Sequence, residues 1–206
     1  MAAELNALPA EVAMPQTDED AARAGVYALF GSLLRDVPDA RLLAQVKALQ
    51  PTSGRDPFAL AWEGVRMAAN RMAAAEIDDE FHTLFIGLGR GECVPYGSWY
   101  QTGLLMEQPL SALRRDLDAL RFERCPDVHE PEDHVAALCD IMSQIAVDPT
   151  VGIEQQQVFY GRHLAPWIDR FCGDLEAAEG AVFYRSVARL GAAFFALEQR
   201  YLNMED

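Results

Sequence analysis

Segment after segment of this chain repeats apolar residues at helical spacing. In the segment 109–121 the repeated residues are Leu110, Leu113, Leu117 and Leu120. In the segment 17–35 they are Ala22, Val26, Leu29, Phe30 and Leu33. Such spacing places the apolar side chains on one face of an α-helix. Similar stripes occur at 38–49, 58–75, 131–148, 150–164, 166–178 and 182–202. No stretch alternates apolar and polar residues as a half-buried strand does, so the pattern predicts an all-α protein.

The segment Glu80–Tyr100 departs from this regularity. It begins as the end of an amphipathic helix, which glycines and a proline then interrupt: Gly87, Gly89, Gly91 and Pro95. Tyr96, Trp99 and Tyr100 follow within five residues. Aromatic side chains combine a large apolar area with a polar edge, which suits binding. The segment is therefore a candidate binding loop. The alternative is a long interhelical loop whose rings fill the core.

Composition limits the classes of partner. The chain has 206 residues, half of them apolar, which is enough to build a hydrophobic core. Its net charge of −15 disfavours nucleic acid, because few cations are present to neutralise phosphates. The same charge disfavours an anionic membrane surface and favours a cationic partner.

The cysteines and the N-terminal residues indicate the compartment. Cys93, Cys125, Cys139 and Cys172 are scattered and form no C-x-x-C pair, which is typical of reduced thiols in a cytosolic protein. The first residues contain no basic signal-peptide region, and no window reaches the roughly 18 apolar residues that span a bilayer. We therefore expect a cytoplasmic protein without stable membrane insertion.

Motifs for catalysis or cofactor binding are missing from the sequence. It has neither a phosphate loop nor a G-x-S-x-G or H-E-x-x-H motif. A dimetal helical bundle needs two Glu-x-x-His pairs, whereas this chain offers only one related pair, Asp79 and His82. We therefore predict no catalytic residue, no metal and no cofactor. A small metal-dependent helical enzyme remains an alternative.

Four segments, taken in order, resemble one protein family. The segment 80–87, EFHTLFIG, is similar to an E-x-x-x-L-F-x-G helix end, and 95–100, PYGSWY, to a P-P-x-x-S-x-Y turn. The segment 130–134, EPEDH, matches an E-P-x-D-H hinge signature. The segments 159–167 and 183–184 together show a weaker likeness to the same family. These motifs belong to the TorD/DmsD-type chaperones that mature bacterial molybdoenzymes.

The resemblance implies an all-helical TorD-like fold with a larger N-terminal lobe and a smaller C-terminal lobe joined by a hinge. The polar, proline-containing segment 122–134 corresponds to the hinge. We therefore expect a flexible tail at 1–16, an N-terminal lobe at 17–121 and a C-terminal lobe at 135–206.

The resemblance also implies a function. Family members are not enzymes. They bind the twin-arginine signal peptide of a molybdopterin oxidoreductase precursor, and often its apo-form, in the cytoplasm until the cofactor is inserted and the protein is exported. Some form domain-swapped homodimers. A NarJ-like chaperone for a reductase subunit that is not exported is the alternative.

Carried over to this sequence, the resemblance implies a peptide-binding face. Its members come from the helix end, the turn and the hinge: Phe81, Leu84, Phe85, Pro95, Tyr96, Ser98, Trp99, Tyr100, Pro131, Asp133 and His134. The carboxylates of Glu80, Glu130 and Asp133 would attract the arginines of the peptide. Alternatively, Leu84 and Phe85 lie in the core, and Glu130 and Asp133 cap a helix and brace the hinge.

Two positions depart from the family pattern. Val94 replaces the first proline of the turn, and Gly97 stands where a larger residue is frequent. We therefore expect a looser turn than in relatives.

Overall fold

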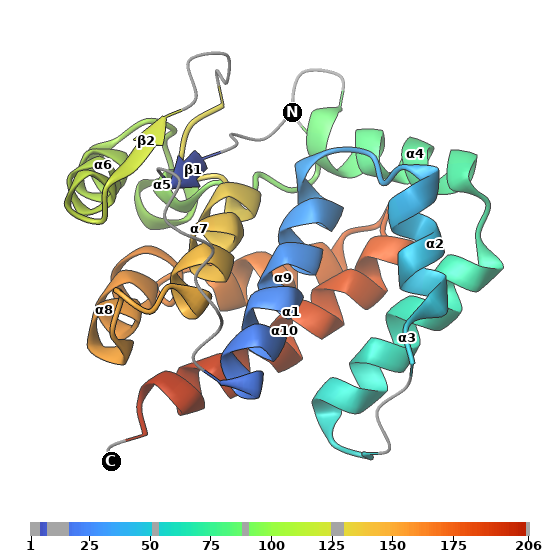
Figure 1. Ribbon diagram of the computed structural model, residues 1–206. Helices are drawn as coiled ribbons and strands as arrows, with labels where there is room; N and C mark the ends of the chain where they lie inside the picture. Colours follow the sequence, from blue (N-terminus) through green and yellow to red (C-terminus); the bar gives the residue numbers. More distant parts are fainter. Residues whose placement is uncertain (1–4, 8–16, 51–53, 88–90, 125–129, 205–206) are drawn as a thin grey trace. The chain divides into compact units, whose positions relative to one another are not determined.

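A computed structural model describes residues 5–7, 17–50, 54–87, 91–124 and 130–204 (Figure 1). The described part of the chain is mainly helical, which confirms the all-α class. The helices before the aromatic segment are α1 (Asp18–Arg35), α2 (Ala40–Ala48), α3 (Pro57–Arg71), α4 (Ala74–Phe81) and the π-helix η1 (His82–Ile86). Those after it are α5 (Gly97–Thr102), α6 (Gln108–Ala119), α7 (Val135–Val147), α8 (Ile153–His163), α9 (Ile168–Ala177) and α10 (Phe183–Leu202).

Local capping signals explain several of these boundaries. The hydroxyl of Thr17 accepts a hydrogen bond from the Asp20 amide at the start of α1, at 3.0 Å. Asp39 and Asp56 cap α2 and α3 in the same way, and Pro57 occupies the first turn of α3. In contrast, the helix expected at 131–148 starts later than predicted. Helix α7 begins at Val135, and the side chain of His134 caps it.

Two short strands add to the helices. Strand β1 (Leu5–Ala7) pairs antiparallel with β2 (Phe122–Arg124), with Leu5 opposite Arg124. Strands of three residues are too short to show the alternation that predicts a strand, which is why the sequence pattern misses them. Strand β1 falls in the expected tail and β2 in the expected hinge. Residues 1–4 and 8–16 of the tail and 125–129 of the hinge lie outside the described residues.

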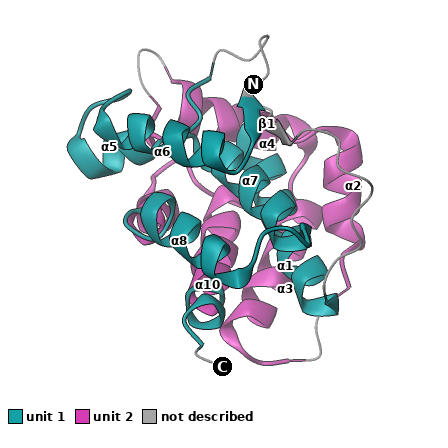
Figure 2. Cartoon of the chain, turned by 60° about the vertical axis from the view of Figure 1, so that its left-hand side comes forward, with its two compact units in different colours: residues 1–35, 95–167, 198–206 teal, residues 36–94, 168–197 magenta. Residues whose placement is uncertain are grey.

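The chain divides into two compact units (Figure 2). Unit 1 comprises residues 1–35, 95–167 and 198–206, and unit 2 comprises 36–94 and 168–197. Each unit is assembled from separate stretches of sequence. The lobe boundaries expected from the sequence follow chain order instead, and they stay a prediction.

The core of unit 1 centres on α7, which packs along α1. Most side chains of α7 are buried, among them Val135 and Ala146 near its two ends, because its sequence is apolar on most sides. Helix α1 turns a different face inward from the predicted one. Of the expected stripe, Phe30 and Leu33 are buried, whereas Ala22 is exposed and the core face includes Arg23.

A buried polar network joins α1 to the end of α10 within unit 1. Arg23 binds Glu198 through Nε and Nη2, at 2.9 and 2.6 Å. It also donates to Asp20 at 2.9 Å and to Gln156 at 3.0 Å, and its guanidinium lies 4.2 Å from the Tyr201 ring. Arg23 is 8% exposed and Glu198 is 1% exposed. Apolar periodicity cannot predict this network, because its members are polar and distant in sequence.

Two further sequence expectations concern thiols and membranes. Cys93, Cys139 and Cys172 are free and buried, and burial raises the pKa of Cys93 to about 12. Cys125 lies outside the described residues. Among the helices that the structure describes, none is both long and apolar enough to cross a bilayer.

Candidate functional site

The aromatic turn and the hinge signature meet within unit 1, although about 35 residues separate them. Tyr96 and His134 form an antiparallel β-bridge. The Gly97 amide donates to the Asp133 carbonyl at 2.9 Å, and the Val135 amide donates to the Pro95 carbonyl at 2.8 Å. The two sequence motifs therefore form one backbone-paired site.

The paired turn is not an open loop, as the sequence suggests, but the start of the short helix α5. Asp133 supplies its N-terminal cap, because one carboxylate oxygen accepts from the Ser98 amide at 2.7 Å. Asp133 is 3% exposed, and its other oxygen, Oδ1, is buried with no hydrogen-bond partner among the described residues. A buried carboxylate oxygen favours a donor, so a water or a ligand N–H group would complete this site.

Tyr96 and Glu130 form the more accessible part of the site. The Tyr96 hydroxyl donates to Glu130 Oε1, and both side chains are half-buried. Burial raises the pKa of the Glu130 carboxyl above its ordinary value. Glu130 is therefore a partly desolvated carboxylate that a cationic ligand would stabilise.

His134 is a buried residue with a structural role. Its ring is 6% exposed and lies edge-on to the Tyr96 ring, with centroids 5.0 Å apart. Burial, and then the nearby positive charge of Arg35, lower the pKa of His134 to about 3, so the ring is neutral at pH 7. Its Nδ1 accepts from the Ala136 amide at 3.1 Å. His134 therefore caps α7 and supports Tyr96 from beneath.

The remaining turn residues divide by accessibility. Pro95 and Ser98 are buried, and the Ser98 hydroxyl accepts from the Met106 amide at 3.2 Å, which fixes the loop that follows α5. Trp99, Tyr100 and Pro131 are half-buried. The three rings of the turn are thus partly accessible, and Tyr96 faces the hinge signature.

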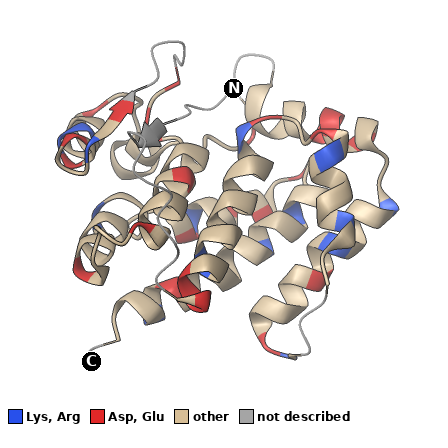
Figure 3. Ribbon diagram, viewed as in Figure 1, with Lys and Arg blue, Asp and Glu red and all other residues tan. Residues whose placement is uncertain are grey.

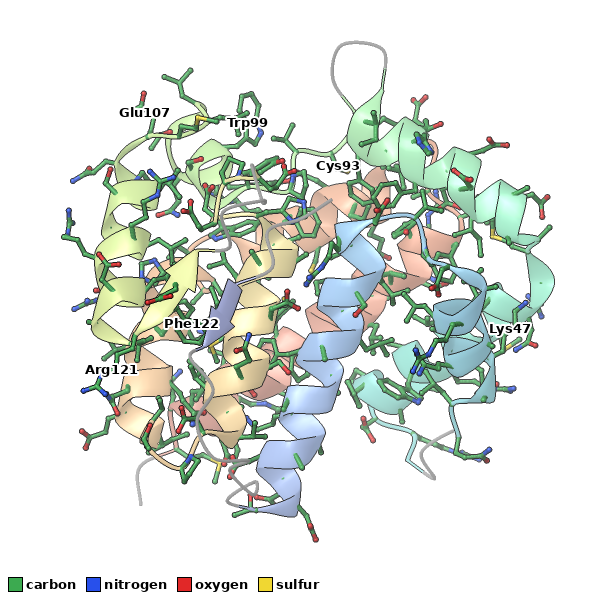
Figure 4. The ribbon with its side chains drawn as sticks, turned by 45° about the horizontal axis from the view of Figure 1, so that its top comes forward. Lys47, Cys93, Trp99, Glu107, Arg121 and Phe122 are labelled. Atoms are coloured by element: carbon green, nitrogen blue, oxygen red, sulfur yellow. The ribbon has the colours of Figure 1, made fainter. Side chains whose placement is uncertain are left out.

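An exposed apolar loop adjoins this site and was not among the predicted residues. Leu104, Leu105 and Met106 are 59%, 47% and 67% exposed. Gly103 ends α5 with a positive φ of 79°, and the loop then leads to Glu107 at the start of α6. In Figure 4 Trp99 and Glu107 project from this end of unit 1. The sequence signal is three consecutive apolar residues directly after a helix-ending glycine.

Gly97 has a specific reason to lack a side chain. A Cβ atom there would lie 3.0 Å from Nε1 and 3.3 Å from Cε2 of Trp167. The Trp167 indole is 1% exposed, donates to the His163 carbonyl at 2.6 Å and stacks on Tyr100. The indole therefore has little freedom to move aside. Around Gly97 the turn is closely packed rather than loose.

This packing makes a testable prediction. Gly97→Ala is expected to lower the free energy of unfolding by about 1–3 kcal/mol, because the new methyl group overpacks against Trp167. Gly161→Ala in α8 is the matched control, since a Cβ there meets nothing within 4 Å. It is expected to stabilise the protein by about 0.5–1 kcal/mol through helix propensity. Urea denaturation of both variants measures the difference, and equal effects would contradict the role given to Trp167.

The predicted helix-end residues lie in unit 2. Glu80 is 6% exposed, and its carboxylate accepts from the amides of Val182, Phe183 and Tyr184 at 2.8, 3.0 and 2.7 Å. This side chain therefore caps the start of α10. Phe81 and Leu84 are buried, and the core alternative expected this of Leu84.

Phe85 is the more accessible of the predicted apolar residues at the helix end. It is half-buried, and its ring lies 5.0 Å from that of Phe81 and 5.2 Å from that of Tyr184. Ile86, the next residue, is 57% exposed. The role of this helix end in binding stays a prediction.

No group of three or more His, Cys, Asp or Glu side chains in the described part of the chain is arranged to hold a metal ion. His82, a member of the related pair considered above, lies 2.8 Å from Oδ1 of Asp78. The turn and the hinge signature instead bring together a half-buried carboxylate and aromatic rings, next to an exposed apolar loop.

Comparison with known proteins identifies the class. Residues 53–173, more than half of the chain, match the family described as nitrate reductase delta subunit. This chain therefore belongs to that family, the TorD/NarJ family of maturation chaperones. The predictions of a chaperone for molybdoenzyme maturation and of a protein that is not an enzyme are confirmed.

Individual relatives agree with this assignment. The chain is 26% identical over 148 residues to the chaperone protein TorD of Vibrio cholerae serotype O1, covering 67% of each chain. It is 27% identical over 156 residues to TorD of Vibrio atlanticus, covering 68% of this chain and 70% of the relative. A candidate redox enzyme maturation protein from Archaeoglobus fulgidus has a similar fold. Its TM-score is 0.56 at 17% identity, over 91% of this chain and 99% of the other. Family membership implies a redox enzyme as the partner.

Proposed function

We propose that this chain binds the twin-arginine signal peptide of a molybdopterin oxidoreductase precursor, and its apo-form, in the cytoplasm. It holds the precursor while the cofactor is inserted, before export. The proposed peptide surface in unit 1 consists of Tyr96, Glu130 and the loop Leu104–Met106.

The observation that carries the proposal is the order of chemical groups along α5. A carboxylate, Glu130, lies against Tyr96 at the start of α5, and three exposed apolar residues follow its end. A six-residue helix is about 9 Å long, roughly the span of three residues of extended peptide. A signal peptide has basic residues followed by an apolar run. The surface therefore offers groups complementary to both parts, at a compatible spacing.

Asp133 gives further support. Its Oδ1 is an acceptor without a partner in the described structure, and it lies within the paired segments that hold Tyr96. A guanidinium group has only donors, and it forms strong hydrogen bonds to carboxylates. An arginine ligand at this surface would thus meet the Glu130 carboxylate directly, and the buried Asp133 carboxylate would add to the negative potential there.

Peptide calorimetry with the full chain tests the proposal. A synthetic twin-arginine peptide is expected to bind, and Glu130→Gln is expected to weaken it about tenfold through loss of a charge-assisted contact. Tyr96→Phe should retain or tighten binding, because it frees the carboxylate while keeping the ring. Glu179→Gln, an exposed acid of unit 2, is the charge-matched control. No binding by the unmodified chain, or equal losses in Glu130→Gln and Glu179→Gln, would contradict the proposed surface.

The affinity is also expected to depend on pH. Burial raises the pKa of Glu130, so this carboxyl takes up its proton at a higher pH than an ordinary glutamate does. Affinity for the arginine peptide should therefore fall as the pH is lowered from 7 through that raised pKa. Because the pKa of Glu130 is higher in the folded than in the unfolded chain, protonation of Glu130 favours the folded state. Protonation of this group would therefore lower the peptide affinity without unfolding the protein. His134, with a pKa of about 3, stays neutral throughout. Calorimetry at several pH values measures the effect, which Glu130→Gln should abolish.

The alternative is a NarJ-like chaperone for a reductase subunit that is not exported. The match to the family described as nitrate reductase delta subunit favours it. Purification of the tagged chain with its client under anaerobic conditions distinguishes the two functions. A client that carries a twin-arginine signal supports the first proposal, and a client without one supports the alternative. A domain-swapped homodimer stays a prediction, which light scattering of the purified chain can test.

A further inference from the structure

A cavity in unit 1 lies between α6 and α8, and Gln101 of α5 also contributes to its lining. It has a volume of about 470 Å³. Its lining consists of Gln101, Pro109, Ala112, Arg115, Asp116, Gly161, Arg162, His163 and Pro166. Two arginines from different helices therefore face one space, in a protein whose net charge is −15. Figure 3 shows basic and acidic positions close together along α6.

The two guanidinium groups are only loosely engaged. Arg162 is 62% exposed, and a single nitrogen, Nη1, contacts the two oxygens of Asp116 at 3.2 and 3.3 Å. This is not the parallel two-bond geometry in which arginine binds carboxylates most strongly. Arg115 is exposed and forms no ion pair within the described part of the chain. Most donors of both side chains thus remain available.

The closest partner of Asp116 is His163 and not Arg162. Its carboxylate lies 2.8 Å from Nε2 of His163, a ring that is 6% exposed. An incoming anion would therefore leave this contact in place and compete only for Arg162. A ligand with a single negative charge would only take the place of the Asp116 carboxylate beside Arg162, so its binding would gain little free energy. A dianion has more negative charge and more acceptor oxygens than a monoanion. It is therefore the ligand that could bridge Arg115 and Arg162.

A second, more apolar cavity shares Asp116 and Arg162 with the first. Its volume is about 280 Å³, and it is lined by residues that include Leu120, Val158 and Phe159. Val158 is 48% exposed. The shared residues place an apolar space directly beside the cationic one. A ligand with an anionic group and an apolar portion could occupy both.

From this geometry we infer that the α6–α8 cavity binds a phosphate dianion, held between Arg115 and Arg162. The shared chemistry is a doubly charged tetrahedral oxyanion, either free phosphate or the phosphate group of an organic molecule whose apolar portion enters the second cavity. This inference does not depend on the proposed peptide binding.

Calorimetry with the full chain, in phosphate-free buffer near pH 8 (about two units above the phosphoester pKa), tests the inference. Inorganic phosphate and phenyl phosphate are the probes, and acetate is the monoanion control. We expect saturable binding of one phosphate per chain and no comparable binding of acetate. Tighter binding of phenyl phosphate identifies an organic phosphate as the ligand, and equal binding identifies free phosphate. Either result supports the site, whereas no saturable binding of either probe, or equal binding of acetate, overturns the inference.

Variants then test the location. Arg115→Ala and Arg162→Ala are each expected to weaken phosphate binding roughly tenfold, because each removes a charge-assisted contact. Asp116→Asn is expected to strengthen it, because the competing charge is lost. The exposed pair Arg189 and Glu176 supplies matched controls, since its atoms lie 2.8 Å apart in unit 2. Arg189→Ala and Glu176→Gln make the same charge changes and should leave phosphate affinity unchanged. Effects equal to those of the α6–α8 variants would show general electrostatics and overturn the assignment.

Discussion

Glu80→Ala is expected to lower the free energy of unfolding by about 3–5 kcal/mol. The Glu80 carboxylate accepts three backbone hydrogen bonds, from Val182, Phe183 and Tyr184, at a site that is 6% exposed. Removing it leaves three amides at the start of α10 without this acceptor. Hydrogen bonds to a charged group contribute about 1.5–3 kcal/mol each, although such contributions do not simply add. The positive end of the helix dipole also loses its nearby negative charge.

Urea denaturation followed by circular dichroism measures this effect. The matched control is Glu76→Ala in the same helix, because Glu76 also accepts from one backbone amide, at 2.7 Å, but is exposed. That change is expected to cost about 0.5–1 kcal/mol. Should Glu80→Ala yield too little folded protein, Glu80→Gln gives an intermediate loss, since an amide offers one acceptor oxygen. Equal midpoints for the Glu80 and Glu76 variants would contradict the capping role.

The same variant addresses the sequence prediction that Glu80 binds peptide arginines. If Glu80 serves only to cap α10, folded Glu80→Gln protein should bind a twin-arginine peptide as the unmodified chain does. A folded variant with lost affinity would instead support the predicted binding role.

Glu198→Ala is the second substitution with a large expected effect, again about 3–5 kcal/mol. Glu198 is 1% exposed. Its carboxylate accepts hydrogen bonds from two nitrogens of Arg23 and from the Tyr27 hydroxyl, the last at 3.1 Å. Truncation leaves a buried guanidinium with Asp20 as its remaining carboxylate partner among the described residues. Breaking a buried ion pair by removing one partner is strongly destabilising, because the other charge stays desolvated.

The exposed pair Arg189 and Glu176 gives the control for this prediction. Its side chains are 58% and 43% exposed, so Glu176→Ala is expected to change stability by only about 0–1 kcal/mol. Glu198→Gln, which keeps a hydrogen-bonding oxygen but loses the charge, should fall between the two. A Glu198→Ala midpoint within error of that of Glu176→Ala would show that the network contributes little to stability.

The helices were predictable because their signals are local. Thr17, Asp39 and Pro57 each act within a few residues of the helix that they start, and the apolar stripe of α6 lies on the buried face as expected, at Leu110, Leu113 and Leu117. Segment 131–134 shows the limit of this reasoning. A proline near acidic residues fits a helix start, but the backbone there pairs with the turn at Pro95–Gly97, and α7 begins only at Val135.

Part of the candidate site was also predictable, since the motifs of the turn and the hinge were both recognised. Their pairing places Tyr96 against Glu130 and His134 in unit 1, although the binding role of these residues stays a prediction. The loop Leu104–Met106 was missed because three apolar residues after a glycine do not show by themselves whether the folded chain exposes or buries them.

The sequence by itself determined the helical class, most helix boundaries and the family motifs, because periodicity, caps and short motifs are local properties. The tertiary structure decided what each motif residue does. Glu80 and Asp133 carry the same carboxylate as Glu130, yet the first two cap helices in the interior and the third is half-buried beside Tyr96. Likewise, Arg23 lies on the core face of α1 because Glu198, 175 residues away, provides its counter-charge. Burial and pairing depend on contacts between distant segments, and only the folded chain creates them.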